Sequence, residues 1–170
     1  MLEIINNLKP FFEDCYRRIS VREFSRTRKI SPPTASKWLE ELFKEGLLKK
    51  EKHKPYIYYF ADKDSGNFIG LSHIYWQNRL EKSGLLKYLE EILLSPIIIL
   101  FGSLAKAEAK ADSDIDLAVF SVSKKKLDLK RFEKKLKRKI QLFQFKDLED
   151  VKSKRLRNNI LNGHKLKGSW

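Results

Sequence analysis

The fold of the second half of this sequence is decided by Leu100-Phe101-Gly102-Ser103 and, ten residues later, by Asp114-Ile115-Asp116-Leu117. The first motif ends the apolar run 97–101, which is typical of a strand covered on both faces. In the second motif two carboxylates alternate with apolar residues at the period of a strand. We therefore expect Asp114 and Asp116 to point to the same side of a small sheet.

These residue types suit a phosphate and a divalent cation. Adjacent carboxylates repel each other when both are ionised, so a cation between Asp114 and Asp116 is the natural complement, and Mg²⁺ is the expected metal. Gly102 would let the backbone approach a phosphate closely. Ser103, at the start of the next helix, would add a hydroxyl to the exposed backbone N–H groups there.

Leu-Phe-Gly-Ser followed by Asp-Ile-Asp-Leu resembles the signature of the nucleotidyltransferase superfamily related to DNA polymerase β. The resemblance is close over residues 101–120, is weaker to about Gly163, and is nearest to the minimal members of the superfamily. It implies transfer of a nucleoside monophosphate from a nucleoside triphosphate, with ATP as the expected donor, and release of pyrophosphate. The implied roles are catalysis and metal binding for Asp114 and Asp116, and nucleotide binding for Gly102 and Ser103.

One position departs from that family pattern. A third carboxylate normally lies on a later strand; here a basic helix is expected over 124–139, then a strand over 140–145, and the carboxylate position falls on Gln141. Glutamine is neutral and cannot accept a proton at ordinary pH. Loss of a general base removes a factor of about 10²–10⁴ in rate. Either transfer is slow or uses Asp147, the nearest later carboxylate, or the domain binds a nucleotide or partner without chemistry.

The first 61 residues have a different pattern. Apolar spacing predicts a helix over 2–12, a short helix capped by Ser20, and a third helix that follows Ser31 and ends at Gly46. Two strands are predicted over 47–51 and 56–61, joined by a basic connection.

This order resembles the winged helix-turn-helix family, in which one helix enters the major groove and the wing contacts phosphate or the neighbouring groove. The resemblance implies DNA contacts by the helix residues Thr34, Ser36 and Lys37 and by the wing residues Lys50, Lys52, His53 and Lys54. The alternative is a small subdomain for protein contacts or dimerisation, since winged folds serve that role too.

The expected fold class is α/β in the α+β sense. It comprises a winged-helix DNA-binding domain over 1–62, a helical connector over 63–94 and a minimal nucleotidyltransferase domain with a small mixed sheet over 95–170. The connector carries two apolar stripes interrupted by Ser83-Gly84, and the tail from Asp147 is expected to be partly helical.

Composition limits the partners. The net charge is +14, and residues 121–170 hold 17 Lys and Arg against 5 Asp and Glu, which favours a polyanionic partner; the alternative is a Lys-rich solvated surface like that of many thermophile proteins. The single cysteine, Cys15, excludes an intramolecular disulfide. The three histidines share no zinc-ligand spacing.

The apolar runs are too short for a membrane span, and a cytoplasmic location is expected.

The leading hypothesis is a DNA-binding protein that transfers AMP from ATP, with Mg²⁺, to a hydroxyl of a protein or nucleic acid. The alternative is a non-catalytic transcription regulator whose transferase-like domain senses a nucleotide or binds a partner. By family analogy alone, a helical partner protein is a further expectation. The sequence does not identify the acceptor, the DNA site or the oligomeric state, and a homodimer is one option among those that winged helices use.

Overall fold

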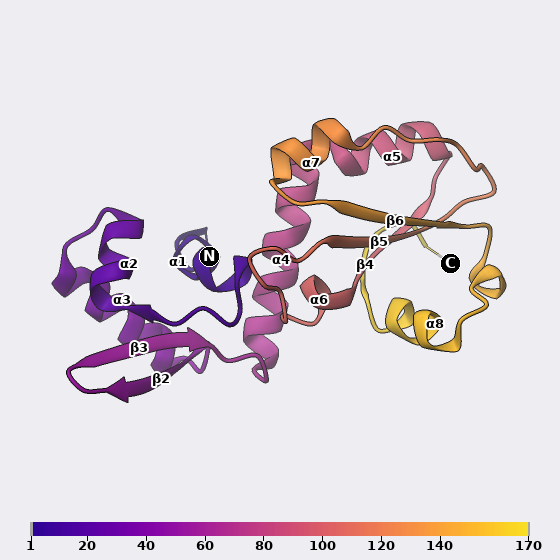
Figure 1. The fold of residues 1–170 in the computed structure, drawn as a ribbon. Coiled ribbons are helices and arrows are strands. Elements are labelled where there is room, and N and C mark those ends of the chain that lie inside the picture. Colours follow the sequence, from indigo (N-terminus) through magenta and orange to yellow (C-terminus); the bar gives the residue numbers. More distant parts are fainter. Residues whose placement is uncertain (1, 170) are drawn as a thin grey trace. The chain divides into compact units, whose positions relative to one another are not determined.

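The computed structural model describes residues 2–169 (Figure 1). The chain divides into two compact units, which are described separately. Unit 1 comprises Met1–Ser72 and Ala107–Ala111, and unit 2 comprises His73–Lys106 and Asp112–Trp170. The division therefore falls inside one helix, α4 (Gly66–Ser83).

The described part of unit 1 contains three complete helices, the N-terminal part of α4 and a three-stranded antiparallel sheet in the order β1-β3-β2. Its elements are α1 (Leu2–Glu13), β1 (Ile19–Ser20), α2 (Val21–Arg28), α3 (Pro32–Lys44), β2 (Leu48–His53) and β3 (Tyr56–Ala61). The three expected helices are confirmed, as are both expected strands of the hairpin, of which β2 extends two residues further than its pattern indicated.

The helix starts in unit 1 follow from their capping residues. The Ser20 side chain accepts a hydrogen bond from the backbone N–H of Glu23, and Ser31 accepts one from that of Thr34, so each satisfies a donor that the first helical turn leaves unpaired. α3 buries Ala35, Leu39 and Leu42, which is the apolar stripe at helical spacing.

Unit 2 is built around a four-stranded mixed sheet in the order β6-β5-β4-β7. Strand β4 pairs antiparallel with β5 and β7, whereas β5 and β6 run parallel. Besides the C-terminal part of α4, its elements are α5 (Leu85–Leu93), β4 (Ile97–Phe101), α6 (Gly102–Ala105), β5 (Ile115–Phe120), α7 (Lys130–Leu136), β6 (Ile140–Phe145), η1 (Leu148–Asp150), α8 (Lys154–Leu161) and β7 (His164–Lys167). The expected mixed α/β architecture is confirmed.

Helices cover both faces of this sheet, as Figure 1 shows: α5 and α7 lie over one face and α6 and α8 over the other. On the α8 face the core includes Ile99, Phe101, Ala118, Phe120 and Ile160. Strand β4 is buried along almost its whole length, as its uninterrupted apolar run predicted.

The predicted bounds of the helix over 124–139 are wrong, because α7 covers only Lys130–Leu136. At its start, the Asp128 carboxylate accepts a hydrogen bond from the backbone N–H of Lys130 at 3.1 Å, an alternative to continuing the helix backwards. At its end, Lys137 adopts the left-handed conformation with φ 56°. Among the described residues, none of the helices has the length and apolarity that crossing a bilayer requires.

Candidate functional site

The candidate site lies where β4 ends and β5 begins. These strands are antiparallel and pair Phe101 with Asp116, so the residue after β4 lies beside the beginning of β5. That residue, Gly102, has φ +73°, and a β-carbon on it would lie 2.1 Å from Oδ2 of Asp116. Glycine is therefore required here both by the backbone conformation and by the carboxylate beside it.

A third side chain comes from β6. The parallel register pairs Asp116 with Gln141, which places Gln141 at the same edge of the sheet. Its Nε2 donates a hydrogen bond to Oδ2 of Asp114 at 2.7 Å. Asp114 precedes β5 by one residue, so this bond rather than the strand pleat locates its carboxylate. Gln141 thus stands beside both aspartates, where the family pattern places a carboxylate.

The surroundings of Asp116 disfavour its negative charge. Partial burial raises the pKa of Asp116 above its usual value, and the negative charge of Asp114 raises it further. Both effects would be relieved by a cation at this edge of the sheet.

The donor set can be tested against Mg²⁺. Among the described residues no group of three or more His, Cys, Asp and Glu side chains gathers in a way that could hold a metal ion. Two carboxylates are nevertheless a set that Mg²⁺ accepts, because it commonly keeps several waters and takes one or two carboxylates together with substrate phosphates. The residues present fit a magnesium ion that binds with its nucleotide.

Ser103 follows Gly102 in the single turn α6, where it is partly buried. Lys106 comes three residues later, and its Nζ donates to Oδ1 of Asn159 on α8 at 3.3 Å. A cation therefore lies close in sequence to the predicted phosphate-binding residues and is held by a neutral partner, which leaves its charge uncompensated by that contact.

The loop that enters the site is anchored by a residue that the sequence did not single out. Arg138 is 9% exposed, its Nη1 donates to the backbone carbonyl of Ser113 at 2.5 Å, and its guanidinium lies 5.1 Å from the centre of the Trp76 ring. Ser113 immediately precedes Asp114, so this arrangement fixes the position of the first aspartate. Arg138 stands within a run of basic residues, and nothing in that run distinguished it.

A histidine pair adjoins α6. The rings of His73 and His164 stack with centroids 4.4 Å apart, although 91 positions separate them in the chain. His73 Nε2 lies 2.6 Å from the carbonyl oxygen of Ala105, and His164 pairs with Leu100 in the sheet. Burial lowers the pKa of His164, and the neighbouring His73 lowers it further. Spacing along the sequence could not show this pair.

Asp147, the alternative carboxylate, is not near this site. Its Oδ1 accepts the backbone N–H groups of Glu149 and Asp150 at 2.9 and 3.1 Å, so it caps η1. It follows the end of β6, whereas Gln141 stands at the beginning of that strand, a separation of about 20 Å along extended chain. The interpretation of Asp147 as a substitute base is therefore wrong.

The residues predicted to contact DNA from α3 are largely on the surface of unit 1. Ser36 and Lys37 are exposed, while Thr34 is partly buried and its hydroxyl lies 2.8 Å from that of Ser31. Lys37 is 3.9 Å from Glu41, one turn further along α3. This ion pair is long and well exposed, so it contributes little to stability.

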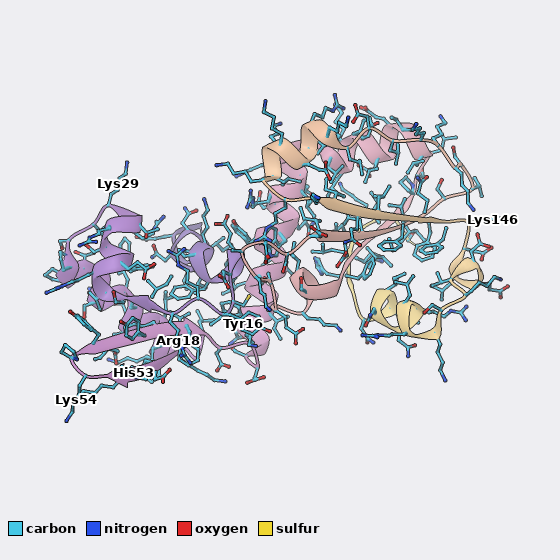
Figure 2. All side chains as sticks on the ribbon, in the orientation of Figure 1. Tyr16, Arg18, Lys29, His53, Lys54 and Lys146 are labelled. Carbon is cyan, nitrogen blue, oxygen red and sulfur yellow. The ribbon has the colours of Figure 1, made fainter. Side chains whose placement is uncertain are left out.

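The hairpin residues divide into two groups. Lys52, His53 and Lys54 are exposed at the tip of the β2–β3 hairpin, and Figure 2 shows Lys54 pointing away from it. Lys50 instead contacts Glu40 at 2.9 Å and lies 4.2 Å from the centre of the Phe43 ring. Lys50 is therefore engaged within unit 1, and so is His53, whose Nε2 contacts Oε1 of Glu51. These contacts set both residues apart from Lys52 and Lys54.

Comparison with known proteins adds one match. The family model described as polymerase beta, nucleotidyltransferase matches residues 85–168, slightly less than half of the chain. This segment contains β4 to β7 with Gly102, Ser103, Asp114, Asp116 and Gln141, and the match supports the nucleotidyltransferase assignment of that part. No curated protein and no solved structure matches the chain.

Proposed function

We propose that this chain is a DNA-binding nucleotidyltransferase that moves a nucleoside monophosphate, AMP from ATP, to a hydroxyl group of a protein or nucleic acid. The observation that carries the proposal is the gathering of Gly102, Asp114 and Asp116 at one edge of the sheet, inside the segment that matches the transferase family. Mg²⁺ is the proposed cofactor, with the two aspartates as its ligands.

Each residue has a defined part in the proposed reaction. Gly102 makes room for the Asp116 carboxylate beside the start of α6, where the backbone N–H groups and the Ser103 hydroxyl would donate to phosphate oxygens. Asp114 and Asp116 would hold a magnesium ion, which when bound would neutralise phosphate charge. The acceptor oxygen bonds to the α-phosphorus, the bond from that phosphorus to the bridging oxygen breaks, and pyrophosphate leaves.

Removal of the proton from the acceptor hydroxyl is expected to be the slow step. Gln141 stands where a carboxylate would receive it, and an amide cannot do so. The proton therefore passes to water, and we expect transfer slower by about 10²–10⁴ than with a general base in place.

The test is transfer of label from ATP labelled at its α-phosphate. The wild-type chain and an Asp114→Asn/Asp116→Asn variant, which preserves side-chain shape, are incubated with labelled ATP, Mg²⁺ and cell extract. We expect labelled acceptor with the wild type and none with the variant. Equal labelling by both proteins would overturn the proposal.

A second candidate function is a regulator that binds nucleotide without transferring it. It is favoured by one contact, the hydrogen bond from Gln141 to Asp114, because a neutral donor there partly compensates the aspartate charge without a second cation. Under this alternative the wild type binds ATP, the Asp114→Asn/Asp116→Asn variant does not bind it, and neither protein labels an acceptor.

For unit 1 we propose a winged helix that binds double-stranded DNA. The order α1-β1-α2-α3-β2-β3 and the exposed Lys37, Lys52 and Lys54 support this role. The start of α3 would enter the major groove, and the hairpin tip would contact phosphate.

A further inference from the structure

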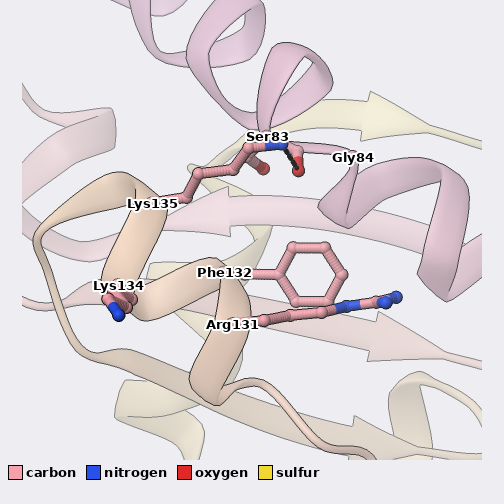
Figure 3. A pocket seen from close by; sticks show the side chains of 6 residues that line it. All are labelled: Ser83, Gly84, Arg131, Phe132, Lys134 and Lys135. Atoms are coloured by element: carbon pink, nitrogen blue, oxygen red, sulfur yellow. Dashed lines mark hydrogen bonds between the residues drawn. The ribbon is translucent and has the colours of Figure 1, made fainter.

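Unit 2 has a basic cavity on the sheet face that bears α5 and α7. The cavity has a volume of about 620 Å³ and opens between the α4–α5 junction and α7 (Figure 3). It is lined by Ser83, Gly84, Arg131, Phe132, Lys134 and Lys135. We call it the α7 pocket. The candidate transferase residues do not line it.

Within the described part of the chain, the three cations of the α7 pocket have no acidic partner. Arg131 and Lys134 are exposed and form no ion pair with any residue between 2 and 169, and Lys135 donates to the backbone carbonyl of Ser83 at 2.9 Å. The one acid of α7, Glu133, accepts the backbone N–H of Ile140 at 2.9 Å. The helix thus turns its carboxylate toward β6 while its cations surround the cavity.

The guanidinium of Arg131 is held in place. Its Cζ lies 4.9 Å from the ring centre of Tyr88 and 4.6 Å from that of Phe132, and Figure 3 shows the side chain lying along the Phe132 ring. Stacking on two rings limits the conformations of Arg131, so less entropy is lost when it binds an anion. Lys134 and Lys135, three and four residues later, lie on the neighbouring surface of the helix.

The surrounding segment extends this charge. Residues 124–139 contain ten Lys and Arg against two Asp and Glu. A thermophile-type surface mixes lysines with glutamates in ion-pair networks, and the pocket cations lack such pairs. An array of unpaired cations instead favours a polyanion, whose bound counterions are released on association.

We propose that the α7 pocket binds the phosphate backbone of a single-stranded nucleic acid. The cavity is large enough for a phosphate group with its sugar, which a flexible single strand can insert and a stiff duplex cannot. Phe132 is buried and Arg131 covers its ring, so bases do not stack there and recognition is independent of sequence. The site shares no residue with the duplex-binding surface proposed for unit 1 and does not depend on the transfer reaction.

The test uses the full chain with Lys52→Ala and Lys54→Ala as a common background, which removes hairpin contacts from the measurement. Binding of a fluorescent 20-nucleotide oligo(dT) is measured by anisotropy across a salt series, with and without Arg131→Gln/Lys134→Gln/Lys135→Gln. Glutamine keeps part of the side-chain packing. We expect about 10-fold weaker binding or more, and a salt slope smaller in magnitude by about 2, since three contacts at about 0.7 each are lost.

The matched control is Lys152→Gln/Lys154→Gln/Arg155→Gln, which removes the same charge at and just before α8, on the other side of the sheet. Equal losses in both triple variants would reduce the effect to net charge and overturn the proposal, as would unchanged binding in the α7 triple variant. Binding to anionic vesicles but not to oligo(dT) would overturn it too.

A single substitution, Lys134→Glu, separates loss of binding from unfolding of the protein. Lys134 is exposed and makes no ion pair with a described residue, so Lys134→Glu should leave the thermal unfolding midpoint within about 2 °C of its background. We expect it to weaken oligo(dT) binding by about threefold or more, because it replaces one phosphate contact with a repulsion. Retention of full affinity by this folded variant would contradict the assignment.

Discussion

The carboxylate of Asp116 occupies the space that a β-carbon on residue 102 would need. The distance from that position to Oδ2 of Asp116 is 2.1 Å, and Gly102 itself has φ +73°. The end of β4 and the aspartate within β5 therefore depend on each other, because the missing side chain of Gly102 makes room for the Asp116 carboxylate.

The first prediction concerns Gly102→Ala. The left-handed backbone costs a non-glycine residue about 1–3 kcal/mol, and the methyl group must also displace Asp116. We expect a lower free energy of unfolding, measured by denaturant titration, together with loss of ATP binding. The control is Gly70→Ala, in α4, where a β-carbon meets nothing within 4 Å. This control should change stability by less than about 1 kcal/mol, and an equal loss in both variants would contradict the argument.

The second prediction concerns Gln141→Glu, which has the same shape as glutamine but a negative charge. Its carboxylate would replace an amide that now donates to Asp114 at 2.7 Å, so without metal three acids would repel and the thermal unfolding midpoint should fall. With Mg²⁺ the midpoint should rise by more than that of the wild type. Label transfer should increase by about 10-fold or more, because a proton acceptor is restored.

Gln141→Met is the neutral comparison for that variant. It also removes the hydrogen bond to Asp114 but adds no charge, so it should gain nothing from Mg²⁺ relative to the wild type. A response to Mg²⁺ by Gln141→Met as large as that of Gln141→Glu would show that the carboxylate is not the cause.

The third prediction contrasts two lysines of the hairpin in unit 1. Lys50 is paired with Glu40, and its hydrogen bond is the main cause of the lowered pKa of that carboxyl, whereas Lys54 is exposed. Lys54→Ala should weaken duplex DNA binding and reduce the salt slope by about one, with stability unchanged. Lys50→Ala should chiefly lower the thermal unfolding midpoint. The reverse pattern in anisotropy and thermal unfolding would refute this division.

The fourth prediction concerns pH and His164. Burial, with His73 beside it, lowers its pKa in the folded state below the ordinary value of 6.5, so the unfolded chain binds more protons below that pH. The contribution of His164 to the free energy of unfolding should therefore be fully present above about pH 6.5 and should decline as the pH falls toward the pKa of the folded state. His164→Phe keeps a ring against His73 but cannot titrate. Denaturation at pH 7.5 and 5.5 should show a smaller loss for this variant than for the wild type.

Local patterns in the sequence predicted much of the fold. Strand β3 occupies the predicted residues 56–61, and Ser20 and Ser31 cap helices where their positions indicated. Each of these features depends on neighbours in the chain: alternation, capping and turn chemistry. The gathering of Gly102 and Asp116 was also foreseeable, since the order of the two motifs places them at adjoining strand ends.

What the sequence missed depends on contacts between distant residues. The end of α7 is set by a left-handed lysine rather than a glycine, so no residue type announced it. Strand β7 is short and polar, with Leu166 as its one buried apolar residue, which left little alternation to recognise. The stacking of His73 on His164 and the anchoring of Ser113 by Arg138 each join residues that are far apart in the chain and lie outside any local pattern.

The pairing of β4 with β7 has a consequence for the order in which the chain acquires its structure. Leu100 pairs with His164, more than sixty positions later, whereas the β2–β3 hairpin joins residues at most thirteen apart. Closing a long loop costs entropy before its contacts repay it, and chains rich in such contacts fold slowly. The hairpin of unit 1 should thus form early, whereas the part of the sheet next to Gly102 should form later, when β7 pairs with β4.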